Sequence, residues 1–538
     1  MSLFGILGGK DRHPMHSPEA ARELIALFPK GDAMRALGEA AQWLRSVGEA
    51  EDFKPSVRIA VVGLLDDAGR EPERELLLRY FRDPKLRNAT GRLAWAAVYD
   101  FWATLAAAYQ RCVKDDLPDY QVGEAGRIAC AALAARALRA RVGQIRVAML
   151  HYESVPAEAW AGLSDVLVRC ERSGVLTAPA HAYEGELRHT TPQLELMGGL
   201  LVAIAAPERL PPEEIDAAFR IAQRFAGAAH LEKDPFDGAT HVLDLDAGTP
   251  PRRLSGGAPP GPRSRYFGAR DAVSRLARML SHHELDMLDE DVRIAREYSP
   301  GQKITVLRQF MAYWGEHPPQ PERQLIRLEG GLNVAHGFHT VCQTIPHVVT
   351  QAEKKGGKAR AGSALEVTDD EAVEPPETWP ERDAGLHVVH AQAGPGVGTW
   401  AEVGDLTAIR IHDRNDWWLA AIRRLALGPQ SALQAEFEVL SRKPFGAWLR
   451  VMGRKDTSAA NWQASGSFAF DYIQAIVLTD RPEPGQAGSI IIPKAKFVPE
   501  QILELLHGER SRLMRLTEFR EQGKDFDWCL FEWVKGSG

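Results

Sequence analysis

The sequence predicts an α+β multidomain protein, in which an N-terminal all-α helical array is followed by antiparallel β-barrels. With 538 residues, the chain is too long for a single hydrophobic core, and about three or four domains are expected. Apolar residues recur at spacings of three and four through region 1–230, as they do in packed helices. From about residue 321 the apolar period changes to two, which is the alternation of strands.

The helical prediction for region 1–230 depends on a cap and on apolar stripes. Ser17, Pro18 and Glu19 supply an N-cap, a proline at the first helical position and an early acidic residue. One stripe at helical spacing consists of Trp95, Val98, Trp102, Leu105 and Tyr109. Further helices are predicted at about 156–173, 192–206 and 212–227.

Region 124–150 is rich in alanine, and small side chains let helices approach closely, so we expect a central packed helix there. The array as a whole resembles a tetratricopeptide-like solenoid in its pattern. No clean repeat of about 34 residues accompanies that resemblance. Arrays of this kind favour an interaction platform over a catalyst.

Region 231–320 is expected to hold a linker, one strand and helices. The strand is predicted at 240–246, and the helices at about 270–298 and 301–314. The stretch 248–265 is rich in proline, glycine and arginine, which favours an exposed loop. Its arginines are also suited to holding a phosphate, which is the less favoured interpretation.

Region 321–455 is predicted to form a small antiparallel barrel, because short alternating segments follow one another closely. The predicted strands are 331–341, 386–389, 404–411, 417–427, 434–440 and 446–452. Residues 351–383 carry a basic and then an acidic tract with too few apolar residues to fold, so a flexible insertion is expected.

Region 456–538 is predicted to form a second small β-rich domain. Its predicted elements are strands at 475–479, 489–497, 513–520 and 526–534 and a short helix near 499–507. A second barrel is favoured over strands that complete the first one.

Composition and charge argue against several classes of protein. The net charge of −7 disfavours a general binder of DNA, RNA or anionic membranes, which needs a basic face. The 5 cysteines lack Cys-x-x-Cys spacing, so neither a disulfide framework nor a zinc site is expected. The longest apolar run, 196–206, is far shorter than the roughly 20 residues that cross a bilayer. Since the first residues also lack a signal-peptide pattern, we expect a cytoplasmic protein without membrane insertion.

Candidate metal ligands do not converge in the predicted elements. His282 and Glu284 lie on a predicted helix, where successive residues point about 100° apart. His336 and His339 are an odd number of positions apart on a predicted strand, so they face opposite sides. No phosphate-loop, nucleophile-elbow or zinc-protease motif occurs in the sequence. The sequence therefore predicts a protein that is not an enzyme and carries no cofactor.

An Arg-x-x-x-Arg pair, Arg323 and Arg327, precedes the first predicted barrel strand, and the segment 391–396 (Ala-Gln-Ala-Gly-Pro-Gly) follows the insertion. Guanidinium is planar and always charged, and it binds phosphate bidentately and stacks on purines. This order resembles, over about 321–455, a PilZ domain, the bacterial receptor module for cyclic di-GMP. The resemblance implies that Arg323 and Arg327 grip the dinucleotide and that an Asp/Asn-x-Ser-x-x-Gly loop, ending here at Gly396, closes the site.

The resemblance is to a degenerate PilZ domain, because Ala391 and Ala393 occupy the acidic and serine positions of that loop. Alanine side chains form no hydrogen bonds, and Pro395 has no backbone N–H. The alternative interpretation of the arginine pair is a set of surface ion pairs with Glu322 and Glu329.

Two functions remain open at this stage. The long N-terminal part resembles large proteobacterial cytoplasmic proteins that end in such barrels and are described as binding cyclic di-GMP. This implies a signalling protein that binds a cyclic dinucleotide through Arg323, Arg327 and Gly396, with protein partners on the helical array. The alternative is a ligand-free scaffold that uses the barrel and the array to bind proteins.

Overall fold

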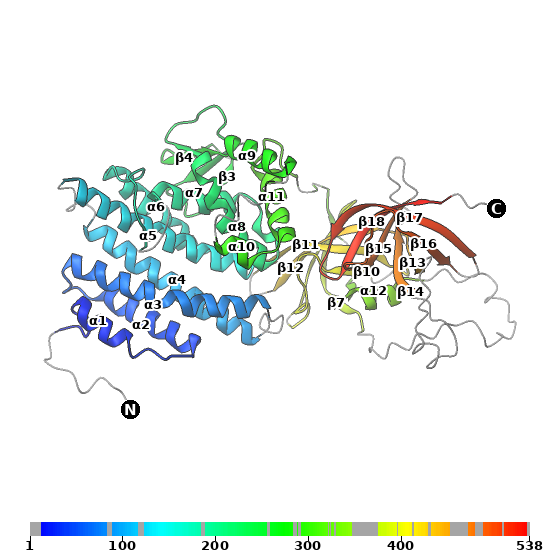
Figure 1. The fold of residues 1–538 in the computed structure, drawn as a ribbon, viewed down its shortest axis with the longest axis horizontal. Helices are drawn as coiled ribbons and strands as arrows, with labels where there is room; N and C mark the ends of the chain where they lie inside the picture. Colours follow the sequence, from blue (N-terminus) through cyan, green and yellow to red (C-terminus); the bar gives the residue numbers. More distant parts are fainter. Residues whose placement is uncertain are drawn as a thin grey trace. The chain divides into compact units, whose positions relative to one another are not determined.

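A computed structural model describes the following residues: 12–82, 89–116, 123–183, 189–254, 259–282, 284, 288, 292–320, 322, 324–327, 330–346, 375–394, 396–411, 414–428, 432–451, 472–478, 488–507 and 510–534. The chain forms two compact units, Met1–Gln320 and Pro321–Gly538. The first is mainly helical and the second is mainly antiparallel β-structure (Figure 1). The predicted fold class, a helical array followed by antiparallel β-structure with a closed barrel, is therefore confirmed.

The helical unit begins with helices α1 to α8, which share one apolar core. Their bounds are α1 Pro18–Ile25, α2 Ala33–Glu49, α3 Pro55–Arg82, α4 Ala89–Asp116, α5 Gly123–Leu150, α6 Ala157–Arg172, α7 Pro192–Ala203 and α8 Pro212–Phe225. The predicted N-cap is present, because the Ser17 hydroxyl accepts a hydrogen bond from the Ala20 N–H at 3.2 Å. This bond satisfies one of the free N–H groups that begin every helix.

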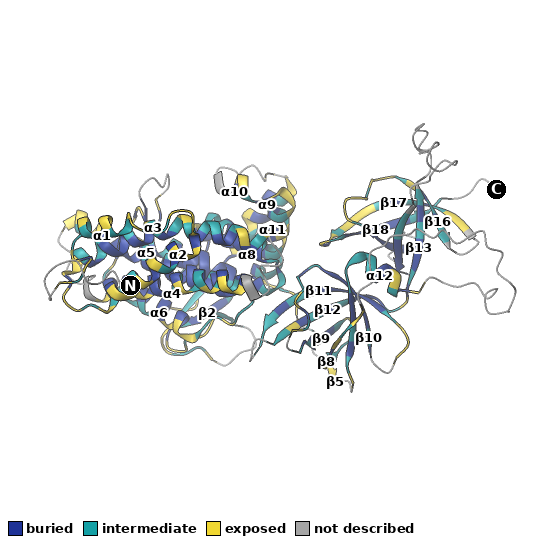
Figure 2. Ribbon diagram, turned by 90° about the horizontal axis from the view of Figure 1, so that it is seen from below, coloured by how far each residue is buried: buried dark blue, intermediate teal, exposed yellow. Residues whose placement is uncertain are grey.

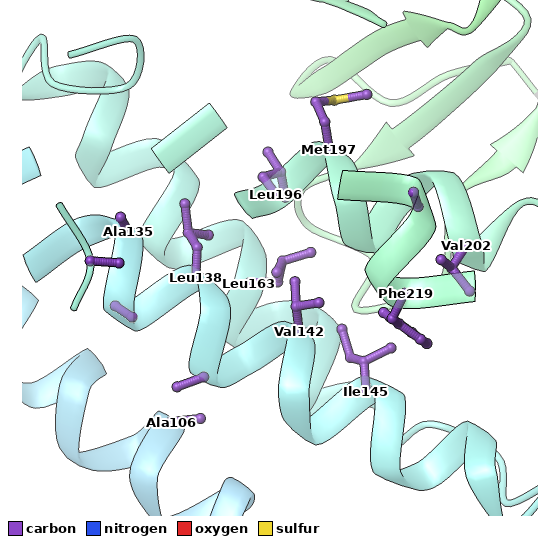
Figure 3. Close-up of a cluster of buried hydrophobic side chains, with 14 of the residues drawn as sticks. Ala106, Ala135, Leu138, Val142, Ile145, Leu163, Leu196, Met197, Val202 and Phe219 are labelled. Atoms are coloured by element: carbon purple, nitrogen blue, oxygen red, sulfur yellow. The ribbon is translucent and has the colours of Figure 1, made fainter. Parts of the chain in front are cut away.

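Helix α5 lies at the centre of this core, which confirms the central helix predicted at 124–150 (Figure 3). The figure shows α5 side chains directed toward those of α6, α7 and α8; the labelled residues include Leu138, Val142, Ile145, Leu163, Leu196 and Phe219. A Cβ at Gly143 would lie 2.2 Å from the Trp102 ring, so only glycine permits this approach of α5 to α4.

The last part of the helical unit contains a sheet with the strand order β1-β4-β2-β3. Its bounds are β1 His230–Glu232, β2 His241–Asp244, β3 Arg252–Arg253 and β4 Ser264–Gly268. The strand predicted at 240–246 corresponds to β2. The prediction that 248–265 forms an exposed loop was wrong for β3 and the start of β4.

Arginines explain why that stretch is ordered. Arg253 donates hydrogen bonds to the carbonyl oxygens of Tyr313 at 2.9 Å and Gly315 at 2.7 Å, which ties β3 to the end of helix α11. Arg265 donates to the Glu171 carboxylate at 2.6 Å. Helices α9 (Arg270–Ser281), α10 (Val292–Glu297) and α11 (Pro300–Trp314) complete the unit, so the single helix predicted at 270–298 was wrong.

The C-terminal unit starts with an eight-stranded sheet of order β5-β8-β9-β12-β11-β10-β6-β7 (Figure 2). Its bounds are β5 Ile326–Arg327, β6 Leu332–His336, β7 Glu377–Trp379, β8 Glu381–Ala384, β9 Val388–Gln392, β10 Leu406–Ile411, β11 Trp418–Leu427 and β12 Leu433–Ser441. Helix α12 (Phe338–Thr344) follows β6, where the sequence predicted one continuous strand at 331–341. Glycine at 337, with φ of 79°, ends the strand before the helix.

A closed barrel follows, with the strand order β13-β14-β15-β18-β17-β16. Its bounds are β13 Pro444–Val451, β14 Tyr472–Leu478, β15 Gly488–Pro493, β16 Ile502–His507, β17 Arg510–Gln522 and β18 Phe526–Trp533. The segment predicted at 446–452 to close the first barrel pairs instead with β14 and β16, so it belongs to the second. The helix predicted near 499–507 was also wrong, because β16 occupies most of it.

The prediction of a flexible insertion at 351–383 was wrong for the C-terminal end of that range. Residues 377–379 form β7, which pairs with β6, and β8 begins at Glu381 and pairs with β9. The indole of Trp379 is fully buried and contacts Phe437 with a ring separation of 5.5 Å. Most of the predicted insertion, 351–374, lies outside the described residues.

Ion pairs connect the eight-stranded sheet to the closed barrel. They lie beside an apolar cluster to which both the sheet and the barrel contribute residues. Arg423 of β11 donates to Glu438 of β12 at 2.7 Å and to Glu521 of β17 at 2.8 Å. The Lys524 ammonium lies 2.9 Å from the Glu402 carboxylate and 3.7 Å from the Asp405 carboxylate. Burial raises the pKa of the Asp405 carboxyl to about 7, and the charge of Lys524 opposes this rise.

No helix among the described residues is both long enough and apolar enough to cross a lipid bilayer.

The Asp405 pKa predicts a specific dependence of stability on pH. Because the folded-state pKa is about 7 and the ordinary value is 3.8, the folded protein holds this proton more tightly than the unfolded chain. The Asp405 contribution to the free energy of unfolding therefore falls as pH rises from about 4 to about 7. The difference in free energy of unfolding between Asp405→Asn and wild type is therefore expected to shift by about 2 kcal/mol in favour of the variant as pH rises from 5 to 8.

Urea unfolding of wild type and Asp405→Asn at both pH values measures this difference. Asp416→Asn, at an exposed position of the same unit, is the matched control and is expected to show no such trend. An Asp405→Asn curve that shifts with pH in parallel with wild type would contradict the assignment.

Candidate functional site

The structure places two of the three predicted ligand residues in the C-terminal unit. Arg323 lies outside the described residues. Arg327 is an exposed residue of β5, at one edge of the sheet. Gly396 lies in the loop after β9 with φ of 78°, and no other atom would crowd a Cβ there. Glycine is therefore required at 396 by the backbone conformation rather than by a close contact.

The two alanines of the predicted loop face the interior of the sheet. Ala391 is a residue of β9 and is 5% exposed, and Ala393 is 1% exposed. The Ala393 N–H donates to the Leu433 carbonyl oxygen at 2.8 Å. Small apolar side chains are what these buried positions require, and neither can form a hydrogen bond with a ligand.

The Glu322 carboxylate is engaged by backbone groups. It accepts hydrogen bonds from the N–H groups of Leu386 at 2.6 Å and His387 at 3.1 Å. Those bonds close the turn between β8 and β9, and they help to lower the Glu322 pKa against the opposing effect of burial. Glu329, the other ion-pair partner predicted for the arginines, lies outside the described residues.

A row of charged residues crosses the outer part of the sheet from Arg327 to β11. In the strand register Arg327 lies opposite Asp383, Asp383 opposite His390, His390 opposite Glu436, and Glu436 opposite Arg424. Residues directly opposite one another in antiparallel strands share a face of the sheet. Basic and acidic residues therefore alternate along the row, and the His390 and Glu436 side chains approach to 3.7 Å.

A hollow of about 200 Å³ lies over the middle of this row. Its lining consists of Asp383, His390, Ala391, Gln392, Arg424, Gln434, Ala435 and Glu436. The amides of Gln392 and Gln434 contact each other at 3.4 Å in the next row of the same face. The surface thus offers carboxylate acceptors, amide groups and cationic donors within one small depression.

The loop that carries Gly396 is held in place by Glu377 of β7. The Glu377 carboxylate accepts hydrogen bonds from the Gly398 N–H and the Trp400 indole N–H, both at 2.9 Å. The Trp400 ring stacks on His336 with a centroid separation of 3.9 Å. His336 therefore belongs to an aromatic contact.

His339 is part of α12, so the prediction that it lies on a strand was wrong. Its ring contacts the Gln343 amide at 2.7 Å, one helical turn away. Among the residues that the structure describes, no group of three or more histidine, cysteine, aspartate or glutamate side chains is arranged to hold a metal ion.

The helical unit contains a second cavity, of about 340 Å³, near the ends of α8 and α9. Its lining consists of Arg224, Phe225, Arg275, Arg278, Met279, His282, Glu284 and Leu288. His282, which the sequence placed on a predicted helix, caps the C-terminus of α9, with its ring nitrogen 3.0 Å from the Arg278 carbonyl oxygen.

The most deeply buried acidic group of the helical unit is structural. Asp66 accepts hydrogen bonds from the hydroxyls of Tyr109 at 2.7 Å and Tyr183 at 2.9 Å. Burial raises the Asp66 pKa, while these bonds and the nearby Arg136 lower it. With its partners inside the core, this carboxylate is not exposed to a ligand.

Residues 19–235 match the family model described as cyclic-di-GMP receptor FimW, N-terminal domain. The matched region covers less than half of the chain and runs from α1 through α8 and β1, so the later helices α9 to α11 of the N-terminal unit lie outside it. No curated protein and no solved structure matches the chain. The helical part is therefore similar to the N-terminal domain of a cyclic-di-GMP receptor, and the C-terminal unit lies outside the match.

The hydrogen bonds of Glu377 predict a test of how the Gly396 loop is held. Glu377→Ala removes the acceptor of the hydrogen bonds from Gly398, Trp400 and Trp379, and a loss of about 1–3 kcal/mol in the free energy of unfolding is expected. Glu377→Gln keeps an acceptor oxygen and is the matched control, with a smaller expected loss. Urea unfolding monitored by tryptophan fluorescence measures both. Equal stability of Glu377→Ala and wild type would show that Glu377 does not hold the loop.

Proposed function

We propose that this protein is a cyclic-di-GMP receptor that acts in signalling by binding rather than by catalysis. The observation that carries the proposal is the similarity of residues 19–235 to the N-terminal domain of a cyclic-di-GMP receptor. The C-terminal unit adds support, because Arg327 lies opposite Asp383 of the polar hollow and the Gly396 loop follows β9, which supplies part of the lining.

The proposed ligand site consists of Arg323, Arg327 and the loop at Gly396, on a degenerate PilZ-like sheet. Two guanidinium groups suit the two phosphates of a cyclic dinucleotide, because each can donate two parallel hydrogen bonds to one phosphate. With Ala391 and Ala393 buried, the loop lacks the acidic and serine side chains of the PilZ pattern, and its contribution would come from backbone groups and from Gln392, which lines the hollow. The arginines would then supply most of the electrostatic attraction.

We further propose that the helical array is a platform for a protein partner in the cytoplasm. Ligand capture changes partner binding only if the ligand binds two arrangements of the protein with different affinity. Contacts of Arg323 and Arg327 with the ligand in only one of the two arrangements would supply such a difference.

A ligand-free scaffold is the second candidate. It is favoured by Ala391 and Ala393, which stand at the acidic and serine positions of the loop and offer a ligand no hydrogen bond from their side chains. In that case the sheet and the helical array would bind proteins with no nucleotide present.

Titration calorimetry of the full chain with cyclic di-GMP tests the proposal. Wild type is expected to bind with micromolar or tighter affinity, and Arg323→Ala/Arg327→Ala is expected to abolish the binding heat. Arg35→Ala/Arg308→Ala removes the same charge at exposed positions of the helical unit and is expected to bind like wild type. If wild type produces no heat at any accessible concentration, the receptor proposal fails and the scaffold is favoured.

A further inference from the structure

The size of the hollow on the charged row limits what it can hold. Pockets for drug-sized ligands enclose about 300–1,000 Å³. At about 200 Å³ this hollow is smaller, so it has room for a single planar base and not for a whole cyclic dinucleotide. The sugars and phosphates of such a ligand would lie outside it, toward the exposed Arg327 at the sheet edge.

Asp383 is the most available hydrogen-bond acceptor in the hollow. It is half-buried, and within the described residues its carboxylate makes no hydrogen bond or ion pair. Glu436, the other carboxylate of the lining, is already 3.7 Å from the His390 ring and lies opposite Arg424 in the register. A hydrogen-bond donor of the ligand would therefore bind the Asp383 carboxylate.

The arrangement of acceptors and donors suits guanine better than adenine. Guanine presents two adjacent donors, N1–H and the N2 amino group, which a carboxylate can accept together. It also presents O6 and N7 as acceptors, which suit a guanidinium group. Adenine presents an unprotonated N1 at the corresponding edge, where it would meet the carboxylate as a second acceptor.

We propose that the hollow binds one guanine of cyclic di-GMP, with the Asp383 carboxylate accepting hydrogen bonds from N1–H and N2–H. This inference rests on the receptor function proposed above and deepens it. Arg327 lies opposite Asp383 on the neighbouring strand, where side chains are about 5 Å apart, and it donates to the adjoining phosphate. Glu436 orients His390 within the row. Asp383 is thus a residue that determines base specificity.

The first experiment varies the ligand and leaves the protein unchanged. Wild-type full-length protein is titrated with cyclic di-GMP, cyclic di-IMP and cyclic di-AMP. Cyclic di-IMP keeps N1–H and lacks the N2 amino group, so its affinity is expected to be ~10-fold lower. Cyclic di-AMP is expected to bind ~100-fold more weakly than cyclic di-GMP. Equal affinity for cyclic di-GMP and cyclic di-IMP would overturn the assignment without any mutation.

The second experiment uses Asp383→Asn, which has nearly the same shape and lacks the charge. Its affinity for cyclic di-GMP is expected to fall ~10- to 100-fold, and its preference over cyclic di-IMP is expected to disappear. Asp416→Asn is the charge-matched control outside the hollow and is expected to bind like wild type. Thermal unfolding of each variant verifies that it is folded.

Failure of this inference is distinguishable from failure of the receptor proposal. If wild type binds cyclic di-GMP and Asp383→Asn keeps both affinity and preference, the base lies elsewhere and the receptor proposal stands. Loss of binding in Arg275→Ala/Arg278→Ala alone would place the ligand in the cavity of the helical unit and overturn the inference. No binding of any cyclic dinucleotide to wild type would overturn both proposals.

Discussion

The antiparallel register of strands β8, β9, β12 and β11 is the constraint on which the proposed ligand site depends. It brings residues from distant parts of the sequence into one row, in which Asp383 is followed by His390 and Glu436. A shift of one residue in any of these strands would turn its charged side chains into the core. The same register buries Ala391 and Phe437, so the apolar packing of the sheet and the polar surface of the hollow are specified together.

The helical unit uses a different principle, because close packing of small residues is combined with buried ion pairs. Asp216 on α8 accepts hydrogen bonds from Arg146 at 2.8 Å and from Arg220 at 3.2 Å. Although burial opposes ionisation, these cations and Tyr298 lower the Asp216 pKa to about 2. Removing one member of such a network leaves a buried charge without its partner, which is costly. These charges fix how α5 and α8 pack, and they are structural.

The fold class followed from the sequence because apolar periodicity is a local property, whereas several elements depended on distant partners. Region 499–507 contains leucines and glutamates that favour a helix, yet it pairs with β13 and β17 and buries Leu503 and Leu505 on alternate positions. Residues 377–384 are mostly polar, and they form strands because β6 and β9 offer hydrogen-bonding edges. At the site, the sequence predicted Arg327 and Gly396 from their order in the chain. Glu436 and Arg424 look like ordinary solvent-facing strand residues until the register is known, while Asp383 falls in the predicted insertion and His390 falls just beyond a predicted strand.

The most direct test of the central claim is hydrogen–deuterium exchange of the full chain with and without cyclic di-GMP. If the ligand binds over the charged row, exchange is expected to slow in the peptides that cover 381–392 and 424–436, while the helical core at α5 is unchanged. Slowed exchange confined to the region around 224–282, with no change in β8, β9 or β12, would contradict the claim and place the ligand in the helical unit.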